Sequence, residues 1–299
     1  MNKRALYNKN DLGKSFGLAV AVMLVGQVVL GLIFAPFVQE DGTLPTVVFW
    51  LMQALYTIAI GLVAFLYATI TKTDFFAATT LNRAPKVSHV GWGCLATVFL
   101  ISLMLPLNEL FIRLIVAMGL PEPAVNLPLQ IVPLILVSCV LAAVTEEILF
   151  RGTISRTVAN SKSKPAALAI CGALFALFHT NPAQTLHQFV LGAFLALLAL
   201  RSGSVWTTIL VHFFNNLVAV ILTFTVQNDA VFVDYWYVFV PVGLLGFAAS
   251  VFGYLKTTSD NWMPVDESEV AMDGNSKIFL IISVVACAIL WLCSLMGWL

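Results

Sequence analysis

The sequence predicts an all-α protein, a polytopic transmembrane bundle of eight or nine helices with its N-terminus in the cytoplasm. Three observations lead to this fold class. Hydrophobic residues make up 60% of the 299 residues and charged residues only 10%, whereas a soluble domain has about 25% charged residues. The apolar residues form runs long enough to cross a bilayer. The basic residues outside those runs fall in alternate loops.

Nine apolar runs are candidate spans, because a transmembrane helix needs roughly 17–25 residues. They lie near residues 15–38, 46–70, 90–118, 129–157, 165–181, 186–200, 204–226, 235–255 and 277–298. The sixth run is short and the link over 181–187 is tight, so the count is eight or nine. We expect a single transmembrane domain over residues 1–299.

The placement of positive charge predicts the orientation. Lysines and arginines outside the spans precede the first run and then follow the second, fourth, sixth and eighth runs. Because cytoplasmic loops carry the excess of Lys and Arg, nine spans with a cytoplasmic N-terminus place all of these loops inside. We therefore expect a multi-pass protein of the cell membrane. The formal net charge of zero excludes a strongly basic binder of nucleic acid.

Several polar side chains lie inside the runs, where burial is costly, so each is a candidate functional residue. They are Glu109, Arg113, Glu146, Glu147, Arg151, His179, His212, Asn215 and Asn216. Glu109 and Arg113 are four residues apart and can pair along one helix face, which is a structural role. Glu147 and Arg151 have the same spacing. Glu146 is rotated by about 100° from Glu147, so it is left without that partner.

The remaining polar side chains are expected to lie at a similar depth in the membrane. With a rise of about 1.5 Å per residue, Glu146, His179 and Asn216 each lie roughly 21–22 Å from the cytoplasmic ends of their spans, and His212 roughly 16 Å. His212 and Asn216 are four residues apart and face the same way, whereas Asn215 points elsewhere and is expected to bond between helices. Independent packing residues would have no reason to share a depth.

This set of side chains is suited to hydrolysing an amide bond. A carboxylate beside an imidazole can hold and deprotonate a water, and Glu146 with His179 fits that role. A second imidazole with an amide N–H can donate to the oxygen that becomes negative, which suits His212 and Asn216. A zinc site formed by Glu146, His179 and His212 is a rival use of the same residues, although the helical HExxH spacing is absent. No cofactor is therefore certain, and zinc stays open.

The motifs resemble those of the CAAX protease and bacteriocin-processing (CPBP, or Abi) family of intramembrane proteases. They are Glu146-Glu147-x-x-x-Arg151, Phe175-x-x-x-His179 and His212-x-x-x-Asn216. The flanking sequences Phe150-Arg151-Gly152 and Gly203-Ser204-Val205-Trp206 also resemble those of the family. The resemblance covers about 130–220, within a catalytic core that we place at 128–226. It implies an endopeptidase in which Glu146 and His179 activate water, His212 and Asn216 bind the oxyanion, and Glu147 and Arg151 support them.

The expected partners are the lipid bilayer and a peptide or lipidated protein substrate within it. The motifs do not distinguish CAAX-type processing from peptide maturation or bacteriocin immunity. Two other classes of function remain open. A polar cluster near the bilayer midplane also suits an ion- or proton-coupled transporter. A non-catalytic immunity or scaffold protein is the other, and loss of Glu146 or His179 would have favoured it.

Overall fold

A computed structural model describes residues 6–123, 127–159, 163–226, 230–262 and 272–298. These residues are almost entirely helical and contain no β-strand, which confirms the predicted fold class. Eight helices are long and apolar enough to cross a membrane. The chain is therefore an integral, multi-pass membrane protein by its composition and helix lengths.

The first four spans follow the predicted apolar runs closely. They are α1 (Asn10–Phe34), extended by the turn η1 (Ala35–Phe37); α2 (Thr46–Ile70); α4 (Val87–Ala117); and a composite span over Ile131–Val158. The short helix α3 (Phe75–Thr79) connects α2 to α4.

Five further helices complete the bundle, together with two short connecting elements. The helices are α8 (Lys164–Phe178), α9 (Thr185–Ser202), α10 (Val205–Thr225), α12 (Trp236–Thr257) and α13 (Gly274–Leu295). The turn η4 (Pro182–Gln184) precedes α9, and the short helix α11 (Ala230–Asp234) precedes α12.

The shortest of the long helices is the fifth, α8. The run lengths had instead predicted a short sixth helix. α8 has 15 residues, and α9 has 18. The apolar run continues to residue 181, but the helix stops at Phe178 because Thr180 adopts a positive φ of 49° and Asn181 caps the following turn. His179 consequently lies at the end of a helix.

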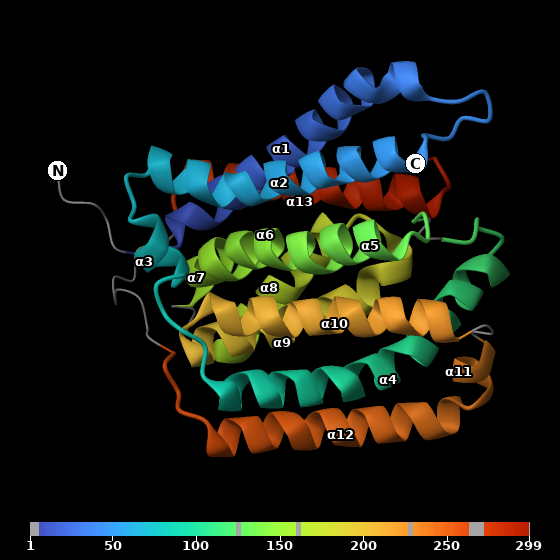
Figure 1. The fold of residues 1–299 in the computed structure, drawn as a ribbon. Coiled ribbons are helices and arrows are strands. Elements are labelled where there is room, and N and C mark those ends of the chain that lie inside the picture. Colours follow the sequence, from blue (N-terminus) through green and yellow to red (C-terminus); the bar gives the residue numbers. More distant parts are fainter. Residues whose placement is uncertain (1–5, 124–126, 160–162, 227–229, 263–271, 299) are drawn as a thin grey trace.

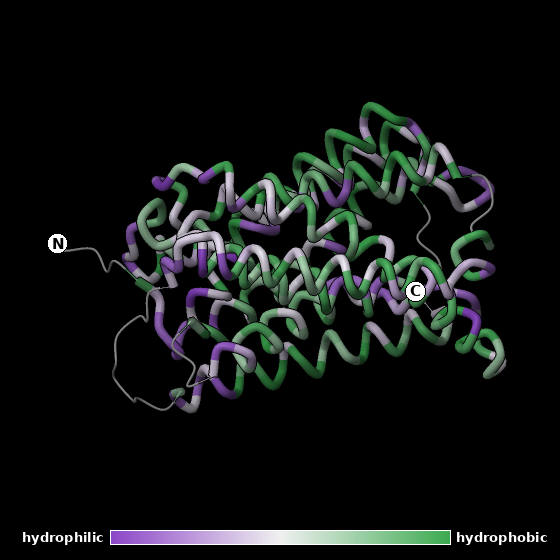
Figure 2. Tube along the Cα trace, turned by 90° about the horizontal axis from the view of Figure 1, so that it is seen from below, coloured by the Kyte–Doolittle hydropathy of each residue, from purple (hydrophilic) through white to green (hydrophobic). Residues whose placement is uncertain are grey.

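The helices lie roughly parallel in three layers (Figure 1). α1, α2 and α13 form one layer, and α4 with α12 forms the layer on the opposite side of the bundle. The fourth span, α8, α9 and α10 lie between them. Figure 2 shows hydrophobic residues along the helices and hydrophilic residues gathered mainly at the two ends. This arrangement places the middle layer where side chains can be shielded from lipid on both sides.

One end of the bundle carries the basic connections. The N-terminus, the connection from α2 to α4 and the start of α8 lie at the same end (left in Figure 1). These segments contain Lys72, Arg83, Lys86 and Lys164. The cytoplasmic orientation of this end stays a prediction from the charge distribution.

The fourth span is irregular on both sides of its two glutamates. A π-helical segment, Leu134–Leu141 (η2), precedes α6 (Ala142–Leu149), and a second, Phe150–Ile154 (η3), separates α6 from α7 (Ser155–Val158). Single π-helical turns rotate the side chains that follow and are frequent at functional sites. Glu146 and Glu147 both lie in the short regular helix between these two segments.

Candidate active site

Glu147 lies at the centre of a fully buried ionic cluster. Its Oε1 accepts hydrogen bonds from Nη1 of Arg151 at 2.8 Å and from Nδ1 of His212 at 2.8 Å. The side chains of Glu147 and Arg151 are 0% and 1% exposed. The bond to His212 joins α6 to α10, which are 65 residues apart in the chain. The predicted pairing with Arg151 is present, and the bond to His212 is an addition that spacing could not indicate.

Arg151 links this cluster to the neighbouring helices. Its Nη2 donates to the carbonyl oxygen of Gly192 in α9 at 3.2 Å, and its Cζ lies 4.2 Å from the centre of the Phe175 ring in α8. A guanidinium group suits this position because it is planar, can donate in two directions and stacks on an aromatic face. The side chain therefore ties α8 and α9 to the fourth span.

Glu146 and His179 face each other across a short gap. Oε2 of Glu146 lies 3.8 Å from Nε2 of His179, and the two side chains are 21% and 16% exposed. This Oε2 is buried and has no hydrogen-bond partner within the described ranges. A distance of 3.8 Å is too long for a direct hydrogen bond, but it is a separation that one water bonded to both atoms would span, since each bond needs about 2.8 Å.

The backbone determines which nitrogen of His179 faces Glu146. Nδ1 lies 2.8 Å from the carbonyl oxygen of Phe175. A carbonyl oxygen can only accept, so Nδ1 carries the hydrogen and the neutral ring presents its lone pair at Nε2. A water between Nε2 and Oε2 of Glu146 would donate a hydrogen to each of these acceptors. Its oxygen lone pairs would then point away from both.

Phe175 brings the two imidazoles into one neighbourhood. Its ring centre lies 4.6 Å from that of His179 and 6.0 Å from that of His212. Phe175 is fully buried and also contacts Phe150 with ring centres 4.9 Å apart. A rigid aromatic side chain thus sets the separation between His179 at the end of α8 and His212 on α10.

Asn216 makes a hydrogen bond between helices, a role that was expected of Asn215. Nδ2 of Asn216 donates to the carbonyl oxygen of Ser138 in η2 at 2.8 Å, so Asn216 makes the bond between helices. Nδ2 of Asn215 donates instead to Oδ1 of Asn216 at 3.0 Å. Asn215 therefore orients the Asn216 amide, and one N–H of Asn216 remains beyond the bond to Ser138.

The proposed metal ligands do not form a ligand set. Glu146 and His179 are neighbours, and Nδ1 of His212 is bonded to Glu147, which leaves Nε2 as the one ring nitrogen of His212 that could reach a metal. Among the described residues, no three His, Cys, Asp or Glu side chains are grouped so that they could hold a metal ion. The residues present do not fit zinc in this arrangement, and we derive no step through a metal.

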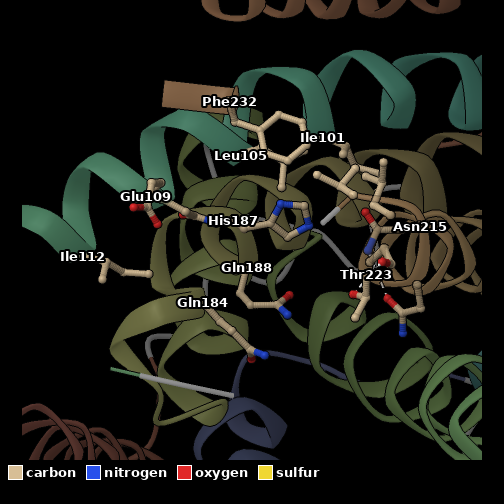
Figure 3. Close-up of a pocket in the computed structure, with 15 residues that line it drawn as sticks. Ile101, Leu105, Glu109, Ile112, Gln184, His187, Gln188, Asn215, Thr223 and Phe232 are labelled. Carbon is tan, nitrogen blue, oxygen red and sulfur yellow. Dashed lines mark hydrogen bonds between the residues drawn. The ribbon is translucent and has the colours of Figure 1, made fainter. Parts of the chain in front are cut away.

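A cavity of about 470 Å³ borders this site and contains polar residues that the sequence analysis missed (Figure 3). It lies between α4, α9, α10 and α11, and its polar wall includes Asn108, Gln184, His187, Gln188, Asn215 and Asn216. Figure 3 shows the imidazole of His187 pointing into the cavity toward Asn215. The spacing Gln184-x-x-His187-Gln188 at the start of an apolar helix was the signal that could have indicated these residues.

Glu109 also lines this cavity. Its Oε1 accepts from Nε of Arg113 at 2.9 Å, with both side chains partly exposed. The predicted pairing of these two residues is therefore confirmed.

Comparison with protein families matches the segment that contains these residues. Residues 128–218 match the family model described as type II CAAX prenyl endopeptidase Rce1-like. We identify this segment as Rce1-like. The match covers the same region as the resemblance drawn from the motifs and confirms it there. Comparisons with curated proteins and with solved structures gave no match.

The Rce1-like segment includes the six residues to which the motifs assign a role, from Glu146 on α6 to Asn216 on α10. The description of the matching family model names an endopeptidase. Part of the cavity wall comes from outside 128–218, because residues of α4 line the cavity.

Proposed function

We propose that this protein is an intramembrane endopeptidase in which Glu146 and His179 activate a water molecule for attack on a peptide bond. The observation that carries the proposal is the 3.8 Å separation of Oε2 of Glu146 and Nε2 of His179. Two acceptors at this distance hold a water by its hydrogens and leave its lone pairs for the carbonyl carbon. The match to an endopeptidase family favours this function over a transporter.

The division of labour between the two glutamates supports the same function. Oε1 of Glu147 is engaged by Arg151 and His212, whereas Glu146 faces His179 across a gap of 3.8 Å. A carboxylate already held by two donors is a poor base, because both donors stabilise its ionised form. Glu146 is therefore the general base and Glu147 a positioning residue.

The reaction follows from these positions. The water oxygen attacks the carbonyl carbon while one of its protons passes to Glu146. The oxyanion that forms accepts hydrogen bonds from Asn216, through the N–H not used by Ser138, and from His212. The carbon–nitrogen bond then breaks, and the proton held by Glu146 passes to the leaving nitrogen. The products are one carboxyl and one amino terminus.

The role of His212 requires a second proton on its ring. Its Nδ1 donates to Glu147, so Nε2 can donate to an oxyanion only in the imidazolium form.

The substitution Glu146→Gln tests this function. It keeps the shape of the side chain and removes the base, so we expect cleavage to fall by about 10²–10⁴-fold, the usual contribution of general acid–base catalysis. The measurement is quantitative proteomics of membranes from cells that produce either form, in which uncut substrates accumulate with the variant. Glu40→Gln is the control, because Glu40 is an exposed glutamate outside the helices and does not line the cavity. A Glu146→Gln protein that cuts at the wild-type rate would contradict the mechanism.

A further inference from the structure

The cavity beside Asn216 has a size and a position that suit part of a substrate. Its volume of about 470 Å³ lies within the range of about 300–1,000 Å³ that is usual for ligand pockets. Asn216, which we propose to bind the oxyanion, is one of its lining residues. A chain bound with its carbonyl oxygen at Asn216 would therefore continue into this space.

The wall of the cavity is polar for a space between membrane helices. Eight of its fifteen lining residues have polar or charged side chains. Among them, Oδ1 of Asn108 and Oε1 of Gln188 are buried and accept no hydrogen bond from the described residues. A buried acceptor left unsatisfied costs about 1–3 kcal/mol, so these two oxygens favour a ligand that brings N–H donors.

These two oxygens distinguish between two substrate segments that could occupy the cavity, a peptide main chain and the hydrocarbon chain of a lipidated substrate. The main chain of a peptide presents an N–H donor at nearly every residue. A hydrocarbon chain presents none and would leave both oxygens desolvated and unbonded. Two different helices, α4 and α9, supply these acceptors.

We propose that this cavity binds a stretch of the substrate's polypeptide main chain through N–H donation to Asn108 and Gln188, and does not hold the hydrocarbon chain of a lipidated substrate. The inference rests on the proposed function, because it assigns the peptide subsite of that same active site. Asn108 and Gln188 are specificity residues in this scheme and take no part in the chemical step.

Two substitutions distinguish a peptide segment from a hydrocarbon chain by the sign of their effect. Asn108→Leu keeps the branching of the native side chain, Gln188→Leu shortens the side chain by one heavy atom, and both make the wall apolar. For a bound main chain, each should raise KM by about 3- to 10-fold, the loss of one hydrogen bond, with kcat changed by less than about 2-fold. For a bound hydrocarbon chain, each should lower KM or leave it unchanged, because an apolar wall accepts hydrocarbon better.

The assay uses the full-length protein in lipid nanodiscs and a collection of proteome-derived peptides in two matched forms, with and without an S-farnesylated cysteine. The most rapidly cut peptide then serves for measurements of kcat and KM. Thr225→Val is the control, because the Thr225 hydroxyl bonds to Ile221 in its own helix at 2.8 Å and does not line the cavity. Unfolding in mixed micelles separates binding from folding. Removing an unsatisfied buried acceptor should leave stability unchanged or higher, whereas a purely structural role would lower it.

Each outcome bears on one proposal or on both. Suppose that KM is unchanged or lower in both Leu variants, and that Glu146→Gln abolishes the cleavage seen with the wild type. This result overturns the peptide subsite and leaves the proposed function standing. Loss of stability in both Leu variants with an unchanged KM likewise overturns the peptide subsite and leaves the proposed function standing. Cleavage that persists in Glu146→Gln, or no cleavage of either peptide form by the wild type, overturns the proposed function and the subsite with it.

Discussion

Two adjacent glutamates have opposite surroundings, and this difference defines the site at the scale of single residues. Glu147 is 0% exposed and shares one oxygen between Arg151 and His212. Glu146 is 21% exposed and faces His179. The cause is the rotation of about 100° between neighbouring residues on a helix, which directs one carboxylate into the bundle and the other toward an accessible gap.

The same contrast predicts a large difference between two ion pairs of identical spacing. Arg151→Gln leaves Glu147 buried without its strongest partner, so we expect the free energy of unfolding to fall by about 3–5 kcal/mol. Arg113→Gln breaks a pair whose side chains are 50% and 31% exposed, and we expect a loss of only about 0–1 kcal/mol. Unfolding of each variant in mixed micelles measures both values. Equal losses would show that burial does not distinguish the two pairs.

At the scale of elements, α8 and α9 approach each other closely behind the site. A Cβ at Gly192 would lie 2.9 Å from Cβ of Phe175 and 3.1 Å from Cα of Gly172. Small residues permit such contacts between membrane helices. The close approach also positions the Gly192 carbonyl oxygen for Arg151 and the Phe175 ring between the two imidazoles.

Gly192→Val therefore acts on both stability and catalysis. The added side chain must separate α8 from α9, and overpacking of this kind costs about 1–3 kcal/mol. We expect kcat to fall and KM to rise, because His179 and Phe175 lie on α8, whereas Gln188, a proposed substrate contact, lies on α9. Steady-state kinetics and unfolding in micelles test this together. A variant with normal stability and reduced kcat would argue against the packing explanation.

The outer pair of helices, α1 and α13, is joined by a polar contact with a predictable pH dependence. Nζ of Lys14 bonds to Oδ2 of Asp273 at 2.7 Å, and the Asp273 backbone N–H donates to Oδ1 of Asn10 at 2.7 Å. The hydrogen bond from Lys14 and the backbone N–H of Ser276 hold the pKa of Asp273 below its ordinary value of 3.8. A carboxyl with a lowered pKa in the folded state stabilises that state at neutral pH.

The stabilising effect of Asp273 should be complete well above pH 3.8 and should disappear as the pH falls through the lowered pKa of the folded protein. Comparison of wild type with Asp273→Asn across this range tests it. We expect the variant to be the less stable form at pH 7 and the two unfolding curves to converge in acid. High salt should reduce the difference at pH 7, because the contact is partly exposed. A difference that is constant with pH would exclude the charge as its cause.

At the scale of the whole molecule, the distribution of basic segments predicts the orientation in the membrane. The positive-inside rule places the end of the bundle that carries Lys72, Arg83 and Lys86 in the cytoplasm. A cysteine introduced by Lys86→Cys should then be protected from an impermeant thiol reagent in intact cells, and one introduced by Glu40→Cys should react. Both positions are exposed, and the wild-type protein gives the background of its native cysteines. The reverse pattern would overturn the orientation.

Much of the architecture was predictable because it depends on local composition. The run predicted at 46–70 coincides with α2 (Thr46–Ile70), and that at 186–200 lies within α9 (Thr185–Ser202). The end of α8 was not predictable from hydropathy, since the helix stops at a backbone conformation at Thr180 and not at a change of polarity. The π-helical segments around α6 have no counterpart in the periodicity of the sequence.

The sequence by itself determined the all-helical, membrane-spanning architecture, the ordered motifs of an endopeptidase family and the pairs of side chains four residues apart. Only the tertiary structure decided that Glu147 bonds to His212, that Asn216 bonds to the carbonyl oxygen of Ser138, and that Asn108 and Gln188 line one cavity. The physical reason is that lipid tails are as apolar as neighbouring helices. Hydrophobicity therefore marks a span but does not tell which of its faces meets another helix, so contacts between distant helices had to come from the folded molecule.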